Sequence, residues 1–206
     1  MQNLIQSEIQ KLATLLTQLQ NDSHLQKIVE DIAKHCVQAL RQGNKILFVG
    51  NGGSAADSQH LAAEFVSRLR YDRPGLSAIA LTTDTSTLTA IGNDYSYENL
   101  FSRQIEAIGQ PGDVLIAIST SGKSPNILKA LDAARTKQIT TVGFTGMQAP
   151  MMAERCDFVL NIPSRETPKI QECHILFGHI ICLLVEDAIF GEQYDPMRKT
   201  AVEAVK

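Results

Sequence analysis

The sequence predicts an α/β fold, a doubly wound five-stranded parallel sheet with helices on both faces and a helical extension at the N-terminus. Short apolar runs alternate with segments of helical spacing from Lys45 onward, which is typical of a layered α/β domain. Four of the five runs are apolar nearly throughout, as strands are when both faces of a parallel sheet are covered. Residues 1–42 carry helical spacing alone. We therefore expect one domain over residues 44–192, preceded by a helical extension over 1–43 and followed by a polar tail over 193–206.

The N-terminal extension is expected to consist of two amphipathic helices. Its apolar residues recur at helical spacing on both sides of Asn21-Asp22-Ser23, which interrupts the pattern and offers an N-cap. Gly43, after the second stripe, is typical of a helix C-cap. The apolar faces must be covered, either by the flank of the domain or by another copy of the chain, and the sequence leaves both open.

The alternation then assigns the remaining elements in order. Strands are expected at 45–49, 76–81, 114–118, 140–144 and 158–162. Helices are expected at 55–70, 85–91, 97–108, 125–137, 150–155 and 168–190. Ligands of such folds bind at the carboxyl ends of the strands, so the turns that follow the strands are the place to expect a site.

Composition excludes several classes of function. The chain has 206 residues, a net charge of -3 and 5% aromatic residues, so it lacks the basic surface that attracts nucleic acid or an anionic membrane. The N-terminus lacks the apolar segment of a signal peptide, and no stretch has the ~18 uninterrupted apolar residues of a membrane span. Cys36, Cys156, Cys173 and Cys182 form no C-x-x-C pair, so we expect reduced, mostly buried thiols in a cytoplasmic protein.

The turn after the first strand reads GNGGSAAD, residues 50–57. Adjacent Gly52 and Gly53 permit positive φ and a close approach of the backbone, and the following helix N-terminus presents free N–H groups to an anion. A tight turn without a ligand would also use glycine. Because Asn51 and Ser54 accompany the two glycines, we favour a ligand site.

The turn after the third strand, AISTSGKS at 117–124, misses the P-loop pattern by one residue, since Ala117 stands where the first glycine belongs. Ser124 followed by Pro125 is typical of a helix start. The hydroxyls around this helix N-terminus belong to Ser119, Thr120, Ser121 and Ser124. They favour a site for one phosphate monoester over a nucleoside triphosphate, because no strand supplies a suitable metal-binding aspartate. Lys123 faces either solvent or the phosphate.

Two segments carry ionisable side chains that could act together. His60 and Glu64 lie four residues apart and therefore on one helix face, where they could hold a metal ion or pair an acid with a base. Such a pair is also common as a surface ion pair. In the last helix Gln171 and His179 lie about 12 Å apart along the axis. His179 stands in an apolar stretch that would also suit a core histidine, so spacing alone does not predict one shared site.

Together these segments resemble the SIS-domain (sugar isomerase) proteins and, within them, the phosphoheptose isomerases of the GmhA family. The resemblance covers essentially the whole chain and rests on GNGGSAADSQHLAAE (50–64), RPG (73–75), GND (92–94), ISTSGKS (118–124) and TPKIQECHI (167–175) with His179 downstream. It implies a flavodoxin-like SIS domain in a cytoplasmic homotetramer, with the N-terminal helices helping to build the tetramer core and active sites near subunit boundaries.

The resemblance also implies the reaction. Phosphoheptose isomerases convert D-sedoheptulose 7-phosphate to D-glycero-D-manno-heptose 7-phosphate through an enediol. This is the first step of ADP- or GDP-heptose precursor synthesis for lipopolysaccharide or related glycans. By resemblance Glu64 is the base and His179 the acid.

One zinc ion per subunit is implied, bound by His60, Glu64, Gln171 and His179. An amide oxygen is an uncommon zinc ligand, so we expect moderate affinity and replacement by other divalent ions. A carboxylate that ligates zinc is a weaker base, which leaves the task of Glu64 at the reaction step open. The implied substrate contacts are Asn51, Gly52, Gly53, Ser54, Asn93, Asp94 and Gln171 for the sugar, and Ser119, Thr120, Ser121 and Ser124 for the phosphate.

A second class within the same fold is not enzymatic. Its members are SIS adaptors that bind the replication initiator DnaA, and in them the glutamate and the second histidine are replaced. Both Glu64 and His179 are present here, and Gly53 stands where that class tends to have threonine, which favours the enzyme. A SIS regulator that senses a sugar phosphate ranks last, because no DNA-binding segment is attached.

Overall fold

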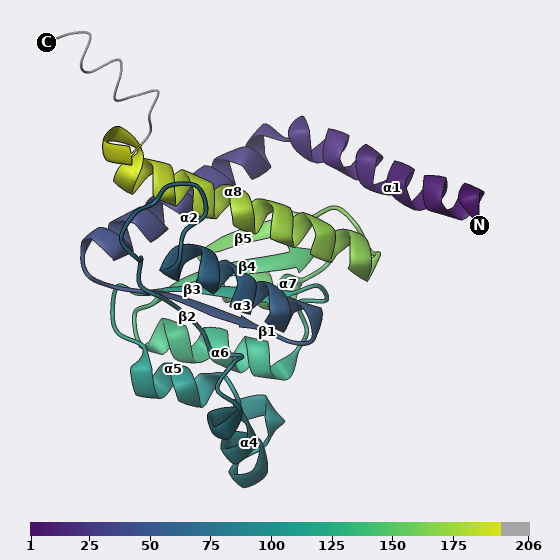
Figure 1. Ribbon diagram of the computed structural model, residues 1–206. Helices are drawn as coiled ribbons and strands as arrows, with labels where there is room; N and C mark the ends of the chain where they lie inside the picture. Colours follow the sequence, from purple (N-terminus) through teal and green to yellow (C-terminus); the bar gives the residue numbers. More distant parts are fainter. Residues whose placement is uncertain (195–206) are drawn as a thin grey trace, which may run out of the picture.

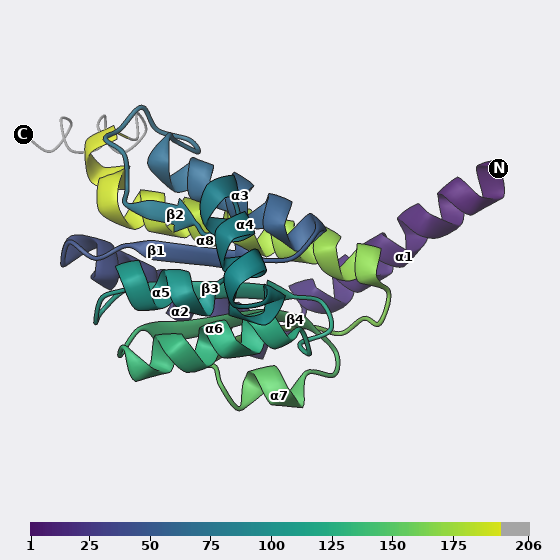
Figure 2. The same ribbon diagram turned by 90° about the horizontal axis from the view of Figure 1, so that it is seen from below.

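The computed structural model describes residues 1–194 as three layers, a central sheet with helices on both faces (Figures 1 and 2). The strands are β1 (Ile46–Gly50), β2 (Ala78–Ala80), β3 (Val114–Ser119), β4 (Thr140–Gly146) and β5 (Phe158–Ile162). They run parallel in the order β2-β1-β3-β4-β5. The predicted five-stranded, doubly wound sheet is confirmed, with the flavodoxin-like strand order.

The helices divide between the two faces of the sheet. One face carries α1 (Gln2–Gln20), α2 (Ser23–Arg41), α3 (Gly53–Val66) and α8 (Thr167–Tyr194). The other carries α4 (Thr85–Asp94), the short 3-10 helix η1 (Tyr97–Asn99), α5 (Ser102–Ile108), α6 (Pro125–Thr136) and α7 (Pro150–Ala153). The single helix expected over 97–108 is thus η1 followed by α5, with the buried Leu100 and Phe101 between them.

The central strands β1 and β3 contribute side chains to both layers of the core. Ile46 and Phe48 of β1 pack with the helices of one face, whereas Leu47 and Val49 pack with those of the other. Every residue of β1 is buried. The alternation of side chains along a strand explains why these two strands are apolar throughout instead of at every second residue.

Of the two alternatives for the N-terminal helices, packing on the flank of the domain is confirmed for α2, and coverage by another copy of the chain stays a prediction. Asp22 caps α2 by accepting a hydrogen bond from the Leu25 N–H at 2.9 Å, and α2 packs its buried residues into the core of the domain. In contrast, α1 extends beyond the sheet (Figure 1), and its apolar residues Leu4, Ile5 and Ile9 stay exposed in the single chain.

Helix α8 is the core helix that completes the layer beside α2 and α3 (Figure 1). Among the described residues it is the one helix long and apolar enough to cross a membrane, with a mean hydropathy of 1.8 over its most apolar window. Packing against the sheet and its neighbours accounts for that composition. It continues to Tyr194, two residues into the expected tail, and the rest of that tail (195–206) lies outside the described residues.

Candidate active site

Two loops meet at the point where the strand order reverses. Gly50 at the end of β1 pairs with Ile118 near the end of β3, so the turns that follow them start side by side at the carboxyl edge of the sheet. Asn51 and Asn126 exchange amide hydrogen bonds of 2.9 and 2.8 Å, and the Tyr97 hydroxyl donates to the Asn51 Oδ1 at 3.0 Å. These bonds hold the glycine-rich turn against the start of α6.

The serine-rich turn is a compact loop on the N-terminus of α6. Ser124 is the N-cap and Pro125 follows, as the sequence predicts, but the Ser124 hydroxyl makes no capping bond and lies 3.4 Å from the Ser119 hydroxyl. The Gly122 N–H donates to the carbonyl and the hydroxyl oxygen of Ser119, both at 3.1 Å. The Gly146 N–H donates to the carbonyl of Thr120 at 3.1 Å and ties the loop to β4. Hydroxyls and free N–H groups therefore surround one helix N-terminus, which suits a phosphate.

Positive charge lies beside this loop. A cavity of about 210 Å³ separates the loop from the segment between β5 and α8, and no acidic side chain lines it. Lys123, whose direction the sequence left open, lines this cavity together with Arg165. Neither side chain has an ion-pair partner among the residues that the structure describes.

The glycine-rich turn touches α8 through Gln171. A Cβ on Gly53 would lie 2.5 Å from the Gln171 amide nitrogen, so a larger residue there would displace the Gln171 side chain. Gly52 is the N-cap of α3 and has a φ of 57°. Ser54 is buried one residue inside the helix. The structure thus brings predicted site residues of both segments into contact.

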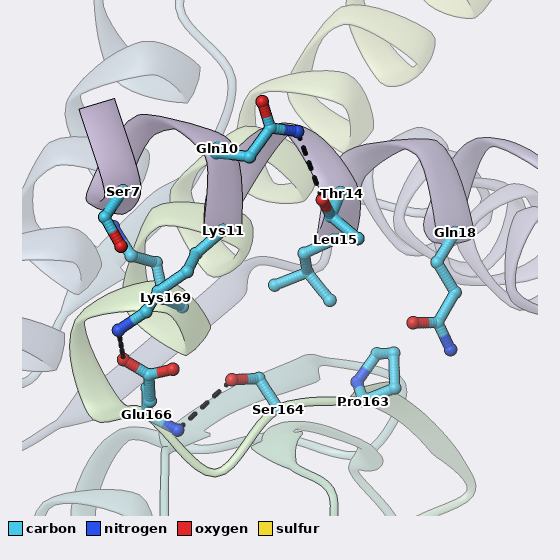
Figure 3. Close-up of a pocket in the computed structure, with 10 residues that line it drawn as sticks. All are labelled: Ser7, Gln10, Lys11, Thr14, Leu15, Gln18, Pro163, Ser164, Glu166 and Lys169. Carbon is cyan, nitrogen blue, oxygen red and sulfur yellow. Dashed lines mark hydrogen bonds and ion pairs between the residues drawn. The ribbon is translucent and has the colours of Figure 1, made fainter. Parts of the chain in front are cut away.

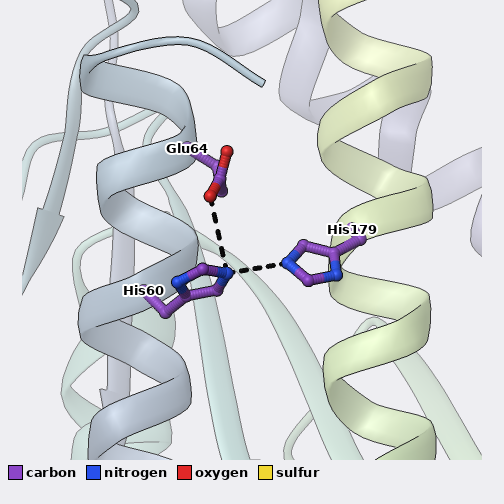
Figure 4. A group of neighbouring side chains, drawn as sticks. All are labelled: His60, Glu64 and His179. Atoms are coloured by element: carbon purple, nitrogen blue, oxygen red, sulfur yellow. Dashed lines mark hydrogen bonds and ion pairs between the residues drawn. The ribbon is translucent and has the colours of Figure 1, made fainter. Parts of the chain in front are cut away.

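Three of the four predicted metal ligands converge between α3 and α8 (Figure 4). The Nε2 atoms of His60 and His179 lie 2.8 Å apart, and the Glu64 Oε1 lies 3.4 Å from the His60 Nε2. All three donor atoms lie within 4.8 Å of one another. Two imidazole nitrogens and a carboxylate oxygen form a donor set that zinc and similar divalent ions accept, so the residues fit a metal ion.

Asn93 and Asp94 are the predicted residues that the structure leaves apart. They lie at the exposed end of α4, where the Asn93 amide donates to the Asp94 carboxylate at 2.8 Å. Within residues 1–194 neither forms a hydrogen bond with a predicted site residue outside this pair. They remain predictions from the resemblance.

The sequence reasoning missed two residues at this site. Asp57 lies one turn before His60 on α3, and its Oδ2 is buried without a hydrogen-bond partner among the described residues. Burial raises the pKa of the Asp57 carboxyl, although charges on His60 and His179 oppose the shift. The three-residue spacing to His60 was a signal for it. Asn126, buried two residues after Ser124, could have been found as a polar residue in the first turn of α6.

A second hollow of about 460 Å³ lies between α1 and the segment that leads into α8 (Figure 3). The Lys11 ammonium pairs there with the carboxylates of Glu166 at 3.0 Å and Glu8 at 2.9 Å. None of the predicted site residues lines it. The ion pair of Lys11 with Glu166 therefore attaches α1 to the domain at this hollow, and the candidate site lies elsewhere.

A buried histidine near the serine-rich loop should make stability depend on pH. The His174 Nε2–H donates to the Thr145 carbonyl at 3.3 Å, and burial lowers the pKa of His174 from 6.5 to about 4. Below pH 6.5 the unfolded chain therefore binds a proton that the folded state does not, and the free energy of unfolding falls by about 2 kcal/mol between pH 7 and pH 5. Above pH 6.5 this contribution to stability is complete.

Urea unfolding at the two pH values measures this loss, with His174→Asn as the variant that takes up no proton. The same loss in variant and wild type would contradict the assignment.

Comparison with known proteins places the site in context. The model of the SIS domain family matches residues 9–146. A phosphoheptose isomerase of Burkholderia pseudomallei (strain 1710b) is 56% identical over 92% of this chain and 96% of its own length. One of Aneurinibacillus thermoaerophilus is 54% identical over 94% of this chain and 98% of its own. The solved structure of the phosphoheptose isomerase GmhA of Neisseria gonorrhoeae is 39% identical, with a TM-score of 0.84 over 90% of this chain and 98% of that one.

Proposed function

This chain belongs to the SIS-domain family and, within it, to the phosphoheptose isomerases, and from that premise we propose that it converts D-sedoheptulose 7-phosphate to D-glycero-D-manno-heptose 7-phosphate. The observation that carries the proposal is the meeting of His60, Glu64 and His179 between α3, which begins at the glycine-rich turn, and α8. A DnaA-binding adaptor would not need this cluster, and no observation favours it.

The isomerisation moves a proton between neighbouring carbon atoms through an enediol. It needs a base near the first carbon and an acid that moves the proton bound to oxygen. Glu64, partly buried on α3, is the proposed base, and His179 on α8 is the proposed acid. The closeness of their donor atoms, within 4.8 Å, supports transfer at two adjacent atoms of one substrate.

The substrate is proposed to lie between the N-termini of α3 and α6. Its phosphate accepts hydrogen bonds from Ser119, Thr120, Ser121 and Ser124. The sugar chain passes the glycine-rich turn and Gln171 toward Glu64. The contact of Gly53 with Gln171 supports this path, because it brings the glycine-rich turn and α8 together.

We propose His60, Glu64, Gln171 and His179 as the ligands of one zinc ion. Two imidazole nitrogens and a carboxylate fit that ion. Bound zinc would polarise the substrate carbonyl and stabilise developing negative charge. The residues of the chain do the rest: they orient the sugar and move the proton.

The assembly and the pathway are also proposals. The exposed apolar residues Leu4, Ile5 and Ile9 of α1 support a homotetramer in which other copies cover this helix. The free cysteines support action in the reducing cytoplasm. We propose that the product feeds ADP- or GDP-heptose synthesis for lipopolysaccharide or a related glycan.

Turnover of D-sedoheptulose 7-phosphate by the purified protein tests the proposal. Activity should disappear after chelation and return when zinc is added. Activity that resists complete removal of metal would contradict the metal assignment. Absence of turnover in every condition, from folded protein, would contradict the isomerase itself.

Ser121→Ala combined with Ser124→Ala should raise KM by about two to four orders of magnitude and change kcat little. Each hydroxyl lost is a hydrogen bond to a charged group, worth about 1.5–3 kcal/mol. Steady-state kinetics measures the effect, and Ser86→Ala on the exposed surface of α4 is the matched control. A double variant with the KM of the wild type would remove these hydroxyls from the phosphate site.

A further inference from the structure

The proposed metal ligands lie on two separate helices, and the backbone hydrogen bonds within each helix do not fix its position relative to the other. His60 and Glu64 lie on α3, and His179 lies on α8, 119 residues from His60. Contacts elsewhere between the helices must therefore set the distance between these donors. We propose that Arg73 and Glu186 form a buried clasp that positions Glu64 and His179 for metal and substrate. The inference rests on the proposed function, and it concerns the residues that fix the positions of the proposed metal ligands.

Arg73 binds the end of α3. Its guanidinium donates to the carbonyl of Phe65 at 2.7 Å, of Glu64 at 2.9 Å, of Pro74 at 3.0 Å and of Ser67 at 3.2 Å. The last carbonyls of a helix have no partner within it, and a cation there is favourable. Arg73 thus supplies the bonds that α3 cannot make for itself.

The position of Glu64 makes this cap relevant to the site. Helix α3 ends at Val66, so Glu64 lies in its last turn. The last turn is the part of a helix that frays most readily. Because Arg73 bonds to the Glu64 carbonyl itself, it holds the residue proposed as base and ligand.

Glu186 forms the other half of the clasp. Its Oε1 accepts from the Arg73 Nε at 2.9 Å, and its carboxylate also accepts from the backbone N–H groups of Leu69, Arg70 and Tyr71 at 3.1, 2.8 and 3.3 Å. Both charged side chains are 1% exposed. The carboxylate on α8 therefore binds Arg73 and the chain that leaves α3.

Glu186 is well placed to act on His179. The two residues are seven apart on α8, which is about two turns or 10 Å along the same face. On the other side of His179, Gly178 meets α3, since a Cβ there would lie 2.6 Å from the Leu61 Cδ1. The helices are thus held together on both sides of the histidine, by close packing at Gly178 and by the clasp at Glu186.

An apolar pair could fill the same space, because replacing a buried ion pair with well-packed apolar residues often leaves stability unchanged or improved. The directional bonds of the clasp add what apolar packing lacks, a defined position for the last turn of α3. Loss of the residues that orient metal ligands typically lowers metal affinity about 10- to 100-fold. Arg73 and Glu186 are positioning residues in this sense.

Glu186→Gln tests the clasp, with Asp113→Asn as the matched control. Asp113 is also a fully buried carboxylate, which pairs with Lys45 at 2.7 Å and accepts backbone N–H groups, but among the described residues its side chain bonds to none on α3 or α8. Chelator competition measures zinc affinity, and thermal unfolding measures stability. We expect Glu186→Gln to bind zinc about 10- to 100-fold more weakly, and Asp113→Asn to keep its affinity at a similar loss of stability.

Arg73→Lys is the second variant if Glu186→Gln does not fold. It keeps the charge and loses the fork of donors, and we expect an intermediate loss of zinc affinity. Wild-type affinity in the clasp variants, or an equal loss in Asp113→Asn, would overturn the inference.

Hydrogen exchange of the metal-free protein tests the clasp independently of the proposed metal site. The amides of the last turn of α3 should exchange faster in the clasp variants than in wild type and Asp113→Asn. Unchanged exchange would overturn the clasp. Wild-type protein that takes up no zinc would overturn the metal site instead.

Discussion

Glu64→Gln is expected to lower kcat by about two to four orders of magnitude while the protein keeps its fold. The amide has the shape of the carboxylate but accepts no proton at neutral pH. Glu64 is only partly buried, so the substitution leaves no uncompensated charge in the core. The measurement is kcat at saturating zinc, because the variant also loses an anionic ligand for the metal.

Glu106→Gln is the control for this variant. Glu106 is an exposed glutamate on α5, on the face of the sheet away from His60 and His179, and its replacement should leave kcat unchanged. Thermal unfolding of both variants shows whether the fold is kept. A Glu64→Gln enzyme with the kcat of the wild type would remove Glu64 from the proton transfer.

Gly122→Ala is expected to raise KM at least about tenfold, which corresponds to 1.4 kcal/mol of lost binding. Gly122 has a φ of 61°, where a side chain is strained. A Cβ there would also collide with the Ala149 Cβ and lie 3.0 Å from the Thr145 Oγ1. Ala149 is buried and has no flexible end that can move aside, so the loop itself must shift. The hydroxyls that hold the phosphate shift with it.

Gly43→Ala is the control for Gly122→Ala, because it introduces backbone strain at a positive φ without a collision of the added Cβ. Gly43 has a φ of 82°, and a Cβ there would meet nothing within 4 Å. It follows α2, remote from the serine-rich loop, and its replacement should lower the melting temperature slightly and leave KM unchanged. Equal kinetics in the two variants would show that the shape of the loop at Gly122 does not govern phosphate binding.

Much of the fold could be predicted because its signals are local. The apolar runs at β1 and β3 identify strands buried on both faces, and their order identifies a parallel sheet. The expected single helix over 97–108 is η1 followed by α5 in the structure, because apolar spacing does not distinguish a 3-10 turn from the first turn of an α-helix. The part of the site that lies within one element could be predicted for the same reason, since helical geometry alone puts His60 and Glu64 on one face.

What the sequence by itself determined is which side chains stand on one face of one element. Backbone geometry sets that relation within a few residues, so the hydroxyls of the serine-rich loop and the pair His60 and Glu64 could be predicted from spacing. The apolar stretch around His179 favoured a core position for it, and only resemblance linked it to the pair. The tertiary structure decided that its Nε2 lies 2.8 Å from that of His60, that Asn51 bonds to Asn126, and that Arg73 meets Glu186. Distances between elements depend on how the whole core packs, and that is a property of many residues together, which no short stretch of sequence contains.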